Sequence, residues 1–155
     1  MPTSVWIDYI VGRFISTGKE ISRELSEKIC LTVDNHSSYV QQLAWLTWIH
    51  TDSIATESDF EEARQDMIDQ NTPLFEKQTE NLTAYQMNFL RAIVSGIHGE
   101  FSTKDVITKY DLGSSANVSA VRRSLTKREL IDVEDRKVII PDPVLEMWLR
   151  REFAR

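Results

Sequence analysis

The residues with the clearest chemical potential lie between positions 114 and 128, where small polar residues precede a run of cations. Helical spacing would place Val118, Val121 and Leu125 on one face, which would pack against a core. The opposite face would then carry small and basic residues: Ala116, Ser119, Ala120, Arg123 and Lys127, with Arg122 and Thr126 on its flank. Small side chains let a helix approach base edges, and Arg or Lys reaches bases or phosphates. The pattern favours contact with DNA, and a solvated face or a protein-binding surface is the alternative.

Two further pairs of residues extend this candidate DNA-binding surface. Ser114 and Ser115 stand before the helix, where its first backbone amides are suited to hold a phosphate. Arg136 and Lys137 lie at the tip of a predicted hairpin and would contact the DNA backbone. Three neighbouring acidic residues, at positions 129, 134 and 135, dilute the positive field of the surface.

A search for catalytic or metal-binding groups finds none. The sequence contains no phosphate-binding G-x-x-x-x-G-K-[ST] loop, no G-x-G-x-x-G after a strand and no G-x-S-x-G elbow. The lone cysteine, Cys30, excludes an internal disulfide framework, and no two of the three histidines stand at a metal-binding spacing. We therefore expect no catalytic residue, no metal site and no enzymatic activity in this chain alone.

The elements around the cations follow a recognisable order. Thr83 and Gln86 have capping-box spacing before a helix that ends near residue 96, and Ser102 is predicted to cap a short helix that stops at Gly113. A third helix covers residues 116–128, residues 130–133 and 137–140 form a hairpin, and a last helix covers residues 144–153. Three helices with a tight turn between the second and third, followed by a hairpin, indicate a winged helix-turn-helix.

The preceding residues are predicted to form amphipathic helices. Residues 5–15 and 21–30 each place apolar side chains on one stripe. Residues 39–49, capped by Ser38, are apolar around most of the circumference and are interpreted as a buried central helix that takes Trp45 and Trp48 into the core. Thr56 and Asp59 are predicted to cap the next helix, and Pro73 is predicted to begin another turn.

Charge divides the chain at about residue 82. Residues 1–82 contain 6 Lys and Arg against 14 Asp and Glu, whereas residues 83–155 contain 12 against 10, within a net charge of −6. This shift predicts two modules, a helical subdomain over residues 1–81 and a winged helix-turn-helix over residues 82–155, in a mainly α-helical protein. The acidic module should repel nucleic acid.

Several strings in the chain resemble one family of ATPases. NHSSYVQQLAWLTW (35–48), DQNTPLFEKQTENLTAYQMNFLRAI (69–93), YDLGSSANVSAVRRSLTKRELID (110–132) and DPVLEMWLRREF (142–153) are similar to the archaeal-type P-loop ATPases, a branch of the AAA-related signalling ATPases. In that family a P-loop nucleotide domain is followed by a helical lid and a C-terminal winged helix. The resemblance covers the lid and the winged helix in the same order, so the chain looks like the C-terminal part of such an ATPase.

The resemblance also implies how such a module is used. ATP and Mg²⁺ would bind only through the P-loop domain, which these 155 residues lack, so no cofactor is expected in this chain. Within a complete ATPase, Asn35, His36 and Tyr39 would occupy the nucleotide-sensing turn of the lid, although Ser37 stands where many relatives carry proline. Changes at the nucleotide would be passed through the lid to the winged helix.

The sequence leaves three functions open. The favoured one is a non-catalytic regulatory module whose winged helix contacts double-stranded DNA or a protein partner, with an upstream ATPase domain as another partner. The second is a stand-alone winged-helix transcriptional regulator with a helical dimerisation or effector domain, and the third is a protein–protein interaction module. With no leader sequence and no membrane-spanning stretch, we expect a cytoplasmic protein that does not contact a membrane.

Overall fold

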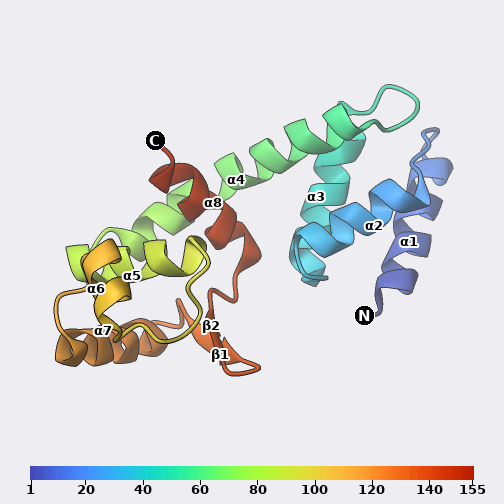
Figure 1. Ribbon diagram of the computed structural model, residues 1–155. Helices are drawn as coiled ribbons and strands as arrows, with labels where there is room; N and C mark the ends of the chain where they lie inside the picture. The colour runs from blue at the N-terminus through green and yellow to red at the C-terminus, as the bar shows by residue number, and fades with distance from the viewer. The chain divides into compact units, whose positions relative to one another are not determined.

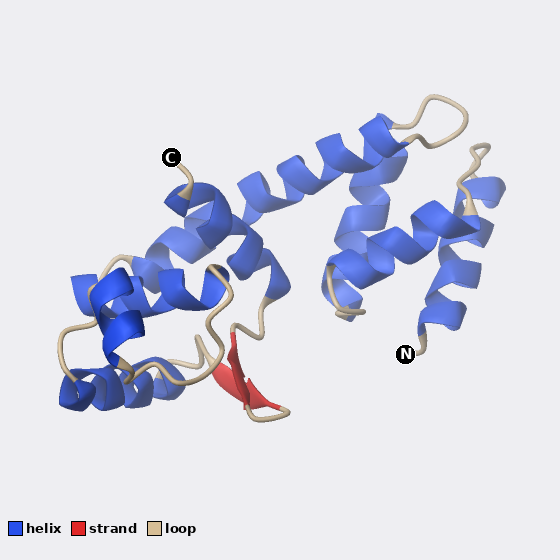
Figure 2. Ribbon diagram, in the orientation of Figure 1, coloured by secondary structure: helices blue, strands red, loops and turns tan.

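The computed structural model describes every residue from Met1 to Arg155 and contains eight α-helices and one two-stranded hairpin (Figure 1; Figure 2). The chain divides into two compact units, unit 1 (Met1–Thr72) and unit 2 (Pro73–Arg155). This mainly helical fold with a small antiparallel hairpin confirms the fold class that the sequence predicts. None of the helices combines the length and the apolar character that a membrane span requires.

Unit 1 consists of three helices and most of a fourth. Their bounds are α1 Thr3–Ser16, α2 Arg23–Thr32, α3 Ser37–His50 and α4 Glu57–Thr79. Each helix contributes apolar side chains to one core, among them Ile10, Phe14, Leu25, Ile29, Val40, Leu43, Phe60 and Met67. Two loops are also joined, because Glu20 N–H donates to Ser53 O at 2.8 Å and Ala55 N–H donates to Glu20 O at 2.9 Å.

The start of α4 confirms its predicted cap, whereas the start of α3 does not. Asp59 N–H donates to Thr56 Oγ1 at 3.1 Å, and Thr56 N–H donates to Asp59 Oδ2 at 2.9 Å. The prediction that Ser38 caps α3 is wrong, because the helix begins at Ser37, two residues earlier than predicted, and His36 stands at its N-cap without a side-chain cap. The left-handed residues 34 and 35 turn the chain sharply after α2, so Ser37 is already helical.

The prediction that α3 is buried around its circumference, with Trp45 in the core, is also wrong. Only one side of the helix is buried, through Val40, Leu43, Leu46 and Thr47. Trp45 is 58% exposed, and Trp48 is half-buried. An all-round apolar helix has no polar face to show which side meets solvent, so periodicity could not place Trp45.

Helix α4 continues through Pro73, which corrects the prediction that Pro73 begins a new turn. Proline cannot donate a backbone hydrogen bond at this position. The Thr72 hydroxyl, next to it, donates to Ile68 O at 2.8 Å. The two compact units meet in sequence at residues 72 and 73, inside α4, whereas the shift in charge lies near residue 82.

Unit 2 contains the remaining helices and the hairpin. Their bounds are α5 Ala84–Val94, α6 Lys104–Tyr110, α7 Ser115–Lys127, β1 Asp132–Glu134, β2 Lys137–Ile139 and α8 Pro143–Phe153. Aromatic rings fill much of its core. The Phe89 and Phe101 rings stack with centroids 4.3 Å apart, and Phe75, from the end of α4, lies 5.8 Å from Trp148 of α8.

Of the helix ends predicted in unit 2, the cap of α5 is confirmed, and the two ends of α6 need correction. The capping box predicted at Thr83 and Gln86 is confirmed, with hydrogen bonds of 2.7 and 3.2 Å. The cap of α6 is Thr103 and not Ser102. Helix α6 ends at Tyr110 and not at Gly113, because Asp111 takes a left-handed conformation (φ 53°) and its carbonyl accepts a hydrogen bond from Asn88 Nδ2 at 3.0 Å. Asp tolerates this conformation better than most residues with a Cβ.

The hairpin forms a short wing. Asp132 pairs with Ile139, Val133 with Val138 and Glu134 with Lys137. Residues 135 and 136 form the turn with φ of 51° and 66°, as a type I′ turn requires. Lys137, predicted at the tip, is therefore the first residue of β2, and residues 130 and 131 precede β1.

The base of the wing is tied to the segment that follows α5. Val138 N–H donates to His98 O at 2.8 Å, and His98 Nδ1 lies 2.9 Å from Val138 O. Because a carbonyl only accepts hydrogen bonds, His98 carries a proton on Nδ1. These two hydrogen bonds join the hairpin to a residue outside its two strands and so hold it in place.

Candidate nucleic-acid interface

Helix α7 is held in unit 2 by an apolar face and by polar contacts at two points. Val118, Val121 and Leu125 are buried, which matches the face predicted to meet the core. Gln86 of α5 donates from Nε2 to Ser124 Oγ at 2.7 Å. This part-buried amide contact joins the first and third helices of the winged helix, and no spacing pattern in the sequence links two residues 38 positions apart.

The turn before α7 depends on a glycine. Gly113 has φ +83°, and a Cβ there would meet Asn117 Nδ2 at 3.0 Å and the Tyr85 ring at 3.3 Å. Asn117 Nδ2 donates to Leu112 O at 2.8 Å, so the Asn117 side chain is already committed to the turn. The positive φ and the neighbouring Asn117 and Tyr85 side chains therefore favour glycine at position 113, in the turn between α6 and α7.

All seven candidate residues of α7 and its cap are exposed: Ser114, Ser115, Ala116, Ser119, Arg122, Arg123 and Lys127. Only Ser114 is a cap, because its Oγ accepts a hydrogen bond from Asn117 N–H at 3.1 Å, whereas Ser115 is the first helical residue. A shallow depression on α7 brings five polar residues together: Ser119, Arg122, Arg123, Thr126 and Lys127. Thr126, predicted only at the flank, thus lies among the cations.

The cations of α7 make no ion pair. No carboxylate oxygen lies within 4.0 Å of Arg122, Arg123 or Lys127, although the chain forms such pairs elsewhere. The three side chains project from one helix into solvent, so their charges are not neutralised locally. Such a surface attracts phosphates more strongly than the near-zero balance of the whole unit would suggest.

Arg136 and Lys137 are exposed on the wing, in the turn and at the start of β2 respectively. Neither forms an ion pair, although Glu134 and Asp135 stand beside them in the chain. Figure 1 shows the hairpin following α7 within unit 2. The wing therefore offers two more free cations next to acidic neighbours, as the sequence predicts.

The residues of the candidate nucleotide-sensing turn lie together at the start of α3, in unit 1. The His36 and Tyr39 rings are 5.0 Å apart, and Asn35 Oδ1 accepts a hydrogen bond from Thr3 Oγ1 at 3.2 Å. They supply an amide, an imidazole and a phenol, but no cation and no glycine-rich loop for a triphosphate. These residues alone do not fit ATP with Mg²⁺, because phosphates need cations or a cradle of backbone amides.

Unit 1 contains a second histidine environment that the sequence did not reveal. His50 Nε2 lies 2.6 Å from Asp66 Oδ2, and His50 Nδ1 lies 3.1 Å from Glu62 Oε2. The hydrogen bond with Asp66, reinforced by the charges of Asp66 and Glu62, raises the pKa of His50. Histidine spacing alone could not find this cluster, because the two carboxylates come from α4 and the imidazole from α3.

Comparison with known proteins places the winged helix in a wider group. A sequence family described as "probable winged helix domain" matches residues 73–151. Among solved structures, a Walker-type ATPase of Pyrococcus abyssi matches 97% of this chain with a TM-score of 0.73 and 18% sequence identity. The chain covers 42% of the length of that ATPase. No protein with a curated description matches the sequence.

Proposed function

Because the chain belongs to the winged helix domain family, we propose that unit 2 binds duplex DNA through α7 and the wing. The observation that carries this proposal is the set of unpaired cations on the exposed side of α7, Arg122, Arg123 and Lys127, around one shallow depression. The opposite side of the same helix is fully committed to the core. The free face is therefore available to a ligand without any loss of packing.

The distribution of side chains along α7 suggests how DNA would be bound. The first two turns expose Ser115, Ala116 and Ser119, which leave room for the helix to approach base edges. Arg123 and Lys127 follow one turn apart and are suited to bases or phosphates. Arg136 and Lys137 would reach the DNA backbone beside the groove. Helix α7 thus exposes small side chains at its N-terminal end and basic side chains toward its C-terminal end.

We infer in addition that the chain acts as the C-terminal regulatory module of an archaeal-type ATPase. The likeness of its fold to part of a Walker-type ATPase and the resemblance of its sequence to that class support this inference. The chain itself contains no phosphate-binding loop, so we expect no ATP hydrolysis from it. Steady ATP turnover that remains with the purified chain through every chromatographic step would contradict this expectation.

The DNA proposal is tested by fluorescence anisotropy of a labelled mixed-sequence duplex at several salt concentrations. Replacing Arg123 and Lys127 by Ala should weaken binding and lower the slope of log K against log salt by about 2, since each phosphate contact contributes about 0.9. Both side chains are exposed, so the fold should be unchanged in circular dichroism.

A matched control removes the same charge elsewhere. Arg23→Ala with Lys28→Ala also deletes two exposed cations, but from unit 1, where each is paired with a carboxylate. This control should keep the salt slope of the wild-type chain. If both double variants bind alike, α7 is not the DNA-binding surface, and a protein partner becomes the preferred interpretation of its exposed face.

A second measurement separates a regulatory module from a stand-alone regulator. A dimeric regulator would have twice the mass of the 17.9 kDa chain in sedimentation and would prefer a duplex with two half-sites. The proposed module should instead sediment as a monomer. A stable dimer on a palindromic duplex would favour the regulator.

A further inference from the structure

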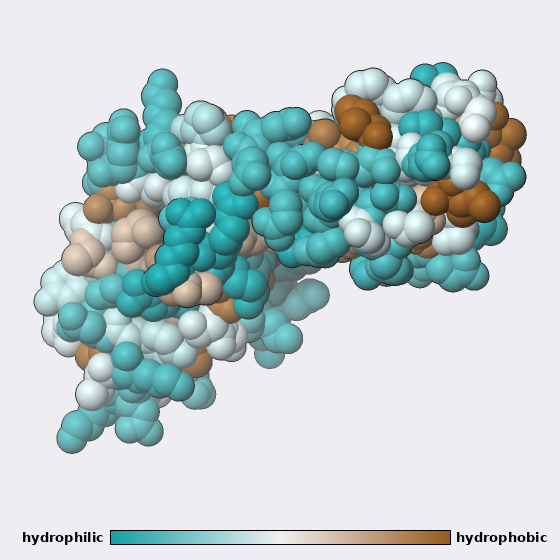
Figure 3. Space-filling view, turned by 90° about the horizontal axis from the view of Figure 1, so that it is seen from above, coloured by the Kyte–Doolittle hydropathy of each residue, from teal (hydrophilic) through white to brown (hydrophobic).

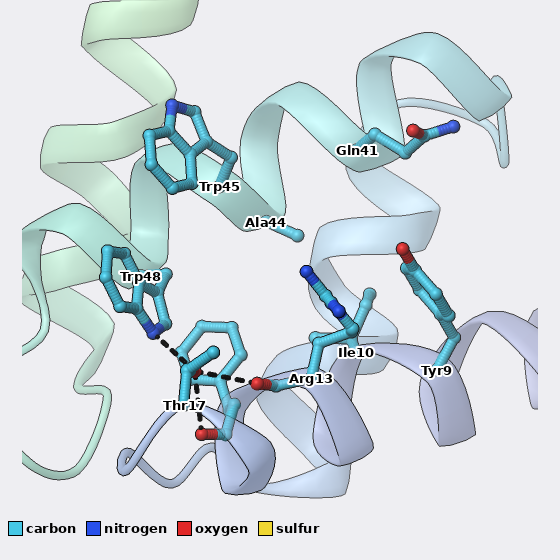
Figure 4. Close-up of a pocket in the computed structure, with 9 residues that line it drawn as sticks. Tyr9, Ile10, Arg13, Thr17, Gln41, Ala44, Trp45 and Trp48 are labelled. Carbon is cyan, nitrogen blue, oxygen red and sulfur yellow. Dashed lines mark hydrogen bonds between the residues drawn. The ribbon is translucent and has the colours of Figure 1, made fainter.

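Unit 1 contains a cavity of about 250 Å³ between α1 and α3 (Figure 4). Its buried floor is Ile10 and Phe14, each 2% exposed. Aromatic rings form two of its sides: Figure 4 shows Trp45 and Trp48 on one side, Tyr9 on the other and Arg13 between them. The remaining lining residues are Thr17, Gln41 and Ala44. The cavity thus lies within one unit and is built by two of its helices.

The indole wall of this cavity is held in a fixed orientation. The Trp45 and Trp48 rings stack with centroids 5.4 Å apart and an interplanar angle of 11°. Trp48 Nε1–H donates to Thr17 Oγ1 at 2.9 Å. The Lys19 ammonium lies 3.9 Å from the centre of the Trp48 ring and donates to Trp48 O at 2.8 Å. A wall that is ordered before binding loses little conformational entropy when a ligand arrives.

The electrostatics of the cavity differ from those of the unit around it. Unit 1 has 5 Lys and Arg against 12 Asp and Glu, yet no carboxylate lines the cavity. Arg13 is its one charged lining residue, and no carboxylate oxygen lies within 4.0 Å of its guanidinium, whereas Arg23, Lys28 and Arg64 in the same unit are all paired. An unpaired guanidinium beside aromatic rings is a ready partner for an anionic group.

Apolar surface is also concentrated in unit 1. It carries eight of the eleven exposed large hydrophobic residues of the chain, including Tyr9 and Trp45 at the cavity. Figure 3 shows hydrophobic patches among polar residues on the right-hand part of the view, where α1 to α3 lie. A tryptophan that is 58% exposed on a helix with a well-packed opposite side gains nothing for the core. Its exposed ring is therefore available to a ligand at the cavity.

We propose that this cavity binds a small planar aromatic ligand with one anionic group. The ring would pack against the Trp45 and Trp48 wall over Ile10 and Phe14, and the anion would face Arg13. A volume of about 250 Å³ lies just below the range of about 300–1,000 Å³ typical of ligand pockets, so one or two fused rings fit and a dinucleotide does not. The acidic charge of unit 1 disfavours a polyanionic strand on the same wall.

The experiment uses the four tryptophan indole N–H signals of the full chain in ¹H–¹⁵N NMR spectra. The probe is 1-naphthoate, and 1-naphthamide is its neutral counterpart of the same shape. We expect saturable shifts of the Trp45 and Trp48 signals, with a Kd of about 1 mM or below for a ligand of this size. Trp148 belongs to unit 2 and does not line the cavity, so its signal should stay in place, whereas the Trp6 ring packs 5.9 Å from the Tyr9 ring of the lining and its signal can follow that contact.

Two variants distinguish the parts of the proposal. Trp45→Ala removes an exposed side chain and should abolish binding, whereas Leu31→Ala, which removes an exposed apolar side chain from α2, should not. Arg13→Gln should weaken naphthoate about fivefold and leave naphthamide unchanged, since an exposed ion pair contributes at about that level. Arg23→Gln, also in unit 1, should leave both probes unchanged.

Three outcomes would overturn the proposal. The first is the absence of any shift at Trp45 and Trp48 with 10 mM probe, roughly tenfold above the expected Kd. The second is equal affinity for the anionic and the neutral probe, which would exclude an anion-binding role for Arg13. The third is a shift of the same size at Trp148, which would indicate contact without a site.

Discussion

Most Lys and Arg residues of unit 1 are paired with carboxylates, whereas those of α7 and the wing in unit 2 are not. In unit 1, three of the five Lys and Arg form ion pairs, namely Arg23 with Asp8, Lys28 with Glu57 and Arg64 with Glu61. In unit 2, none of the six cations of α7, the residue after it and the wing does so: Arg122, Arg123, Lys127, Arg128, Arg136 and Lys137. Most cations of unit 1 are paired within the unit, with Arg13 and Lys19 as the exceptions, and those of this part of unit 2 face solvent.

This difference shows why total charge is a weak guide to a binding surface. Unit 2 has 13 Lys and Arg against 12 Asp and Glu, which is almost neutral. Exposed ion pairs contribute only about 0–1 kcal/mol to stability, so leaving cations unpaired costs little. The unpaired set nevertheless produces a local positive potential that pairing would cancel. A ligand responds to that local field and not to the sum over the unit.

The largest expected loss of stability comes from substitutions in the two cores, and it tests whether the two units unfold independently. Leu43→Ala in α3 and Leu125→Ala in α7 each remove a fully buried side chain, and each should cost about 2–5 kcal/mol of stability. We expect amide hydrogen exchange to speed up mainly in the unit that carries the substitution. DNA affinity should fall for Leu125→Ala and be retained for Leu43→Ala in conditions where unit 2 stays folded. Equal loss of protection in both units would show that they unfold together.

The second largest effect on stability is expected from glycines in turns, whose surroundings differ between the two units. Gly18 and Gly113 both have positive φ, so an alanine at either costs about 1–2 kcal/mol. At Gly18 a Cβ meets nothing within 4 Å, but at Gly113 it meets Asn117 Nδ2 at 3.0 Å and threatens its bond to Leu112 O. Gly113→Ala should therefore be more destabilising than Gly18→Ala by about 1 kcal/mol in urea unfolding. An equal loss of stability for the two alanine variants would mean that the Asn117 side chain moves away from the new Cβ without a loss of free energy.

The wing offers a smaller effect in which stability and binding move in opposite directions. Arg136 holds a left-handed conformation (φ 66°), which costs about 1 kcal/mol for a residue with a Cβ. Arg136→Gly should stabilise unit 2 by up to about that amount and weaken DNA binding, because a free cation is lost. Melting temperature and anisotropy measure the two effects on the same sample. Arg136→Asn, which also removes the charge, is the matched control. If only the glycine variant binds DNA more weakly, the loss is due to the geometry of the wing and not to the missing charge.

The smallest effect is a pH dependence confined to unit 1. The pKa of His50 is raised in the folded state, so the protonated imidazole stabilises the fold. This stabilisation is complete below the pKa of an unfolded histidine, near 6.5, and is lost as the pH rises through the pKa of the folded state. The urea midpoint should therefore fall between pH 6 and pH 8, after subtraction of the same curve for His50→Gln. An unchanged difference between the two proteins across this range would show that the Asp66 contact does not favour the charged imidazole.

Sequence patterns predicted local features of the fold better than contacts between distant residues. The capping boxes at Thr56 and Thr83 each depend on residues three positions apart, and both are confirmed. The predicted cap at Ser38 is wrong by two residues and that at Ser102 by one, because the turn before each helix decides where the helix begins. The hairpin is predicted from two apolar runs that flank the polar residues 134–136, and the pairing register shows a two-residue turn at 135 and 136.

The candidate sites illustrate the same limit. Periodicity was sufficient to separate the buried and exposed faces of α7, since Val118, Val121 and Leu125 repeat at helical spacing. It could not show that Gln86 reaches Ser124 or that His50 meets Asp66, because both contacts join separate helices. The cavity at Trp45 was missed for a further reason. A residue type that is usually buried was assigned to the core, and only the tertiary arrangement of α1 and α3 leaves it in solvent.

The bond between His98 and Val138 has a consequence for protein engineering. The wing is anchored at its base, on β2, while its tip is a two-residue turn without tertiary hydrogen bonds. Residues can therefore be inserted beside the turn two at a time in each strand, which keeps the facing of the side chains below them and the hydrogen-bonded pair that a two-residue turn closes. Such grafts would lengthen the reach of the hairpin while α7 keeps its place, so wing length is an independent design variable in this scaffold.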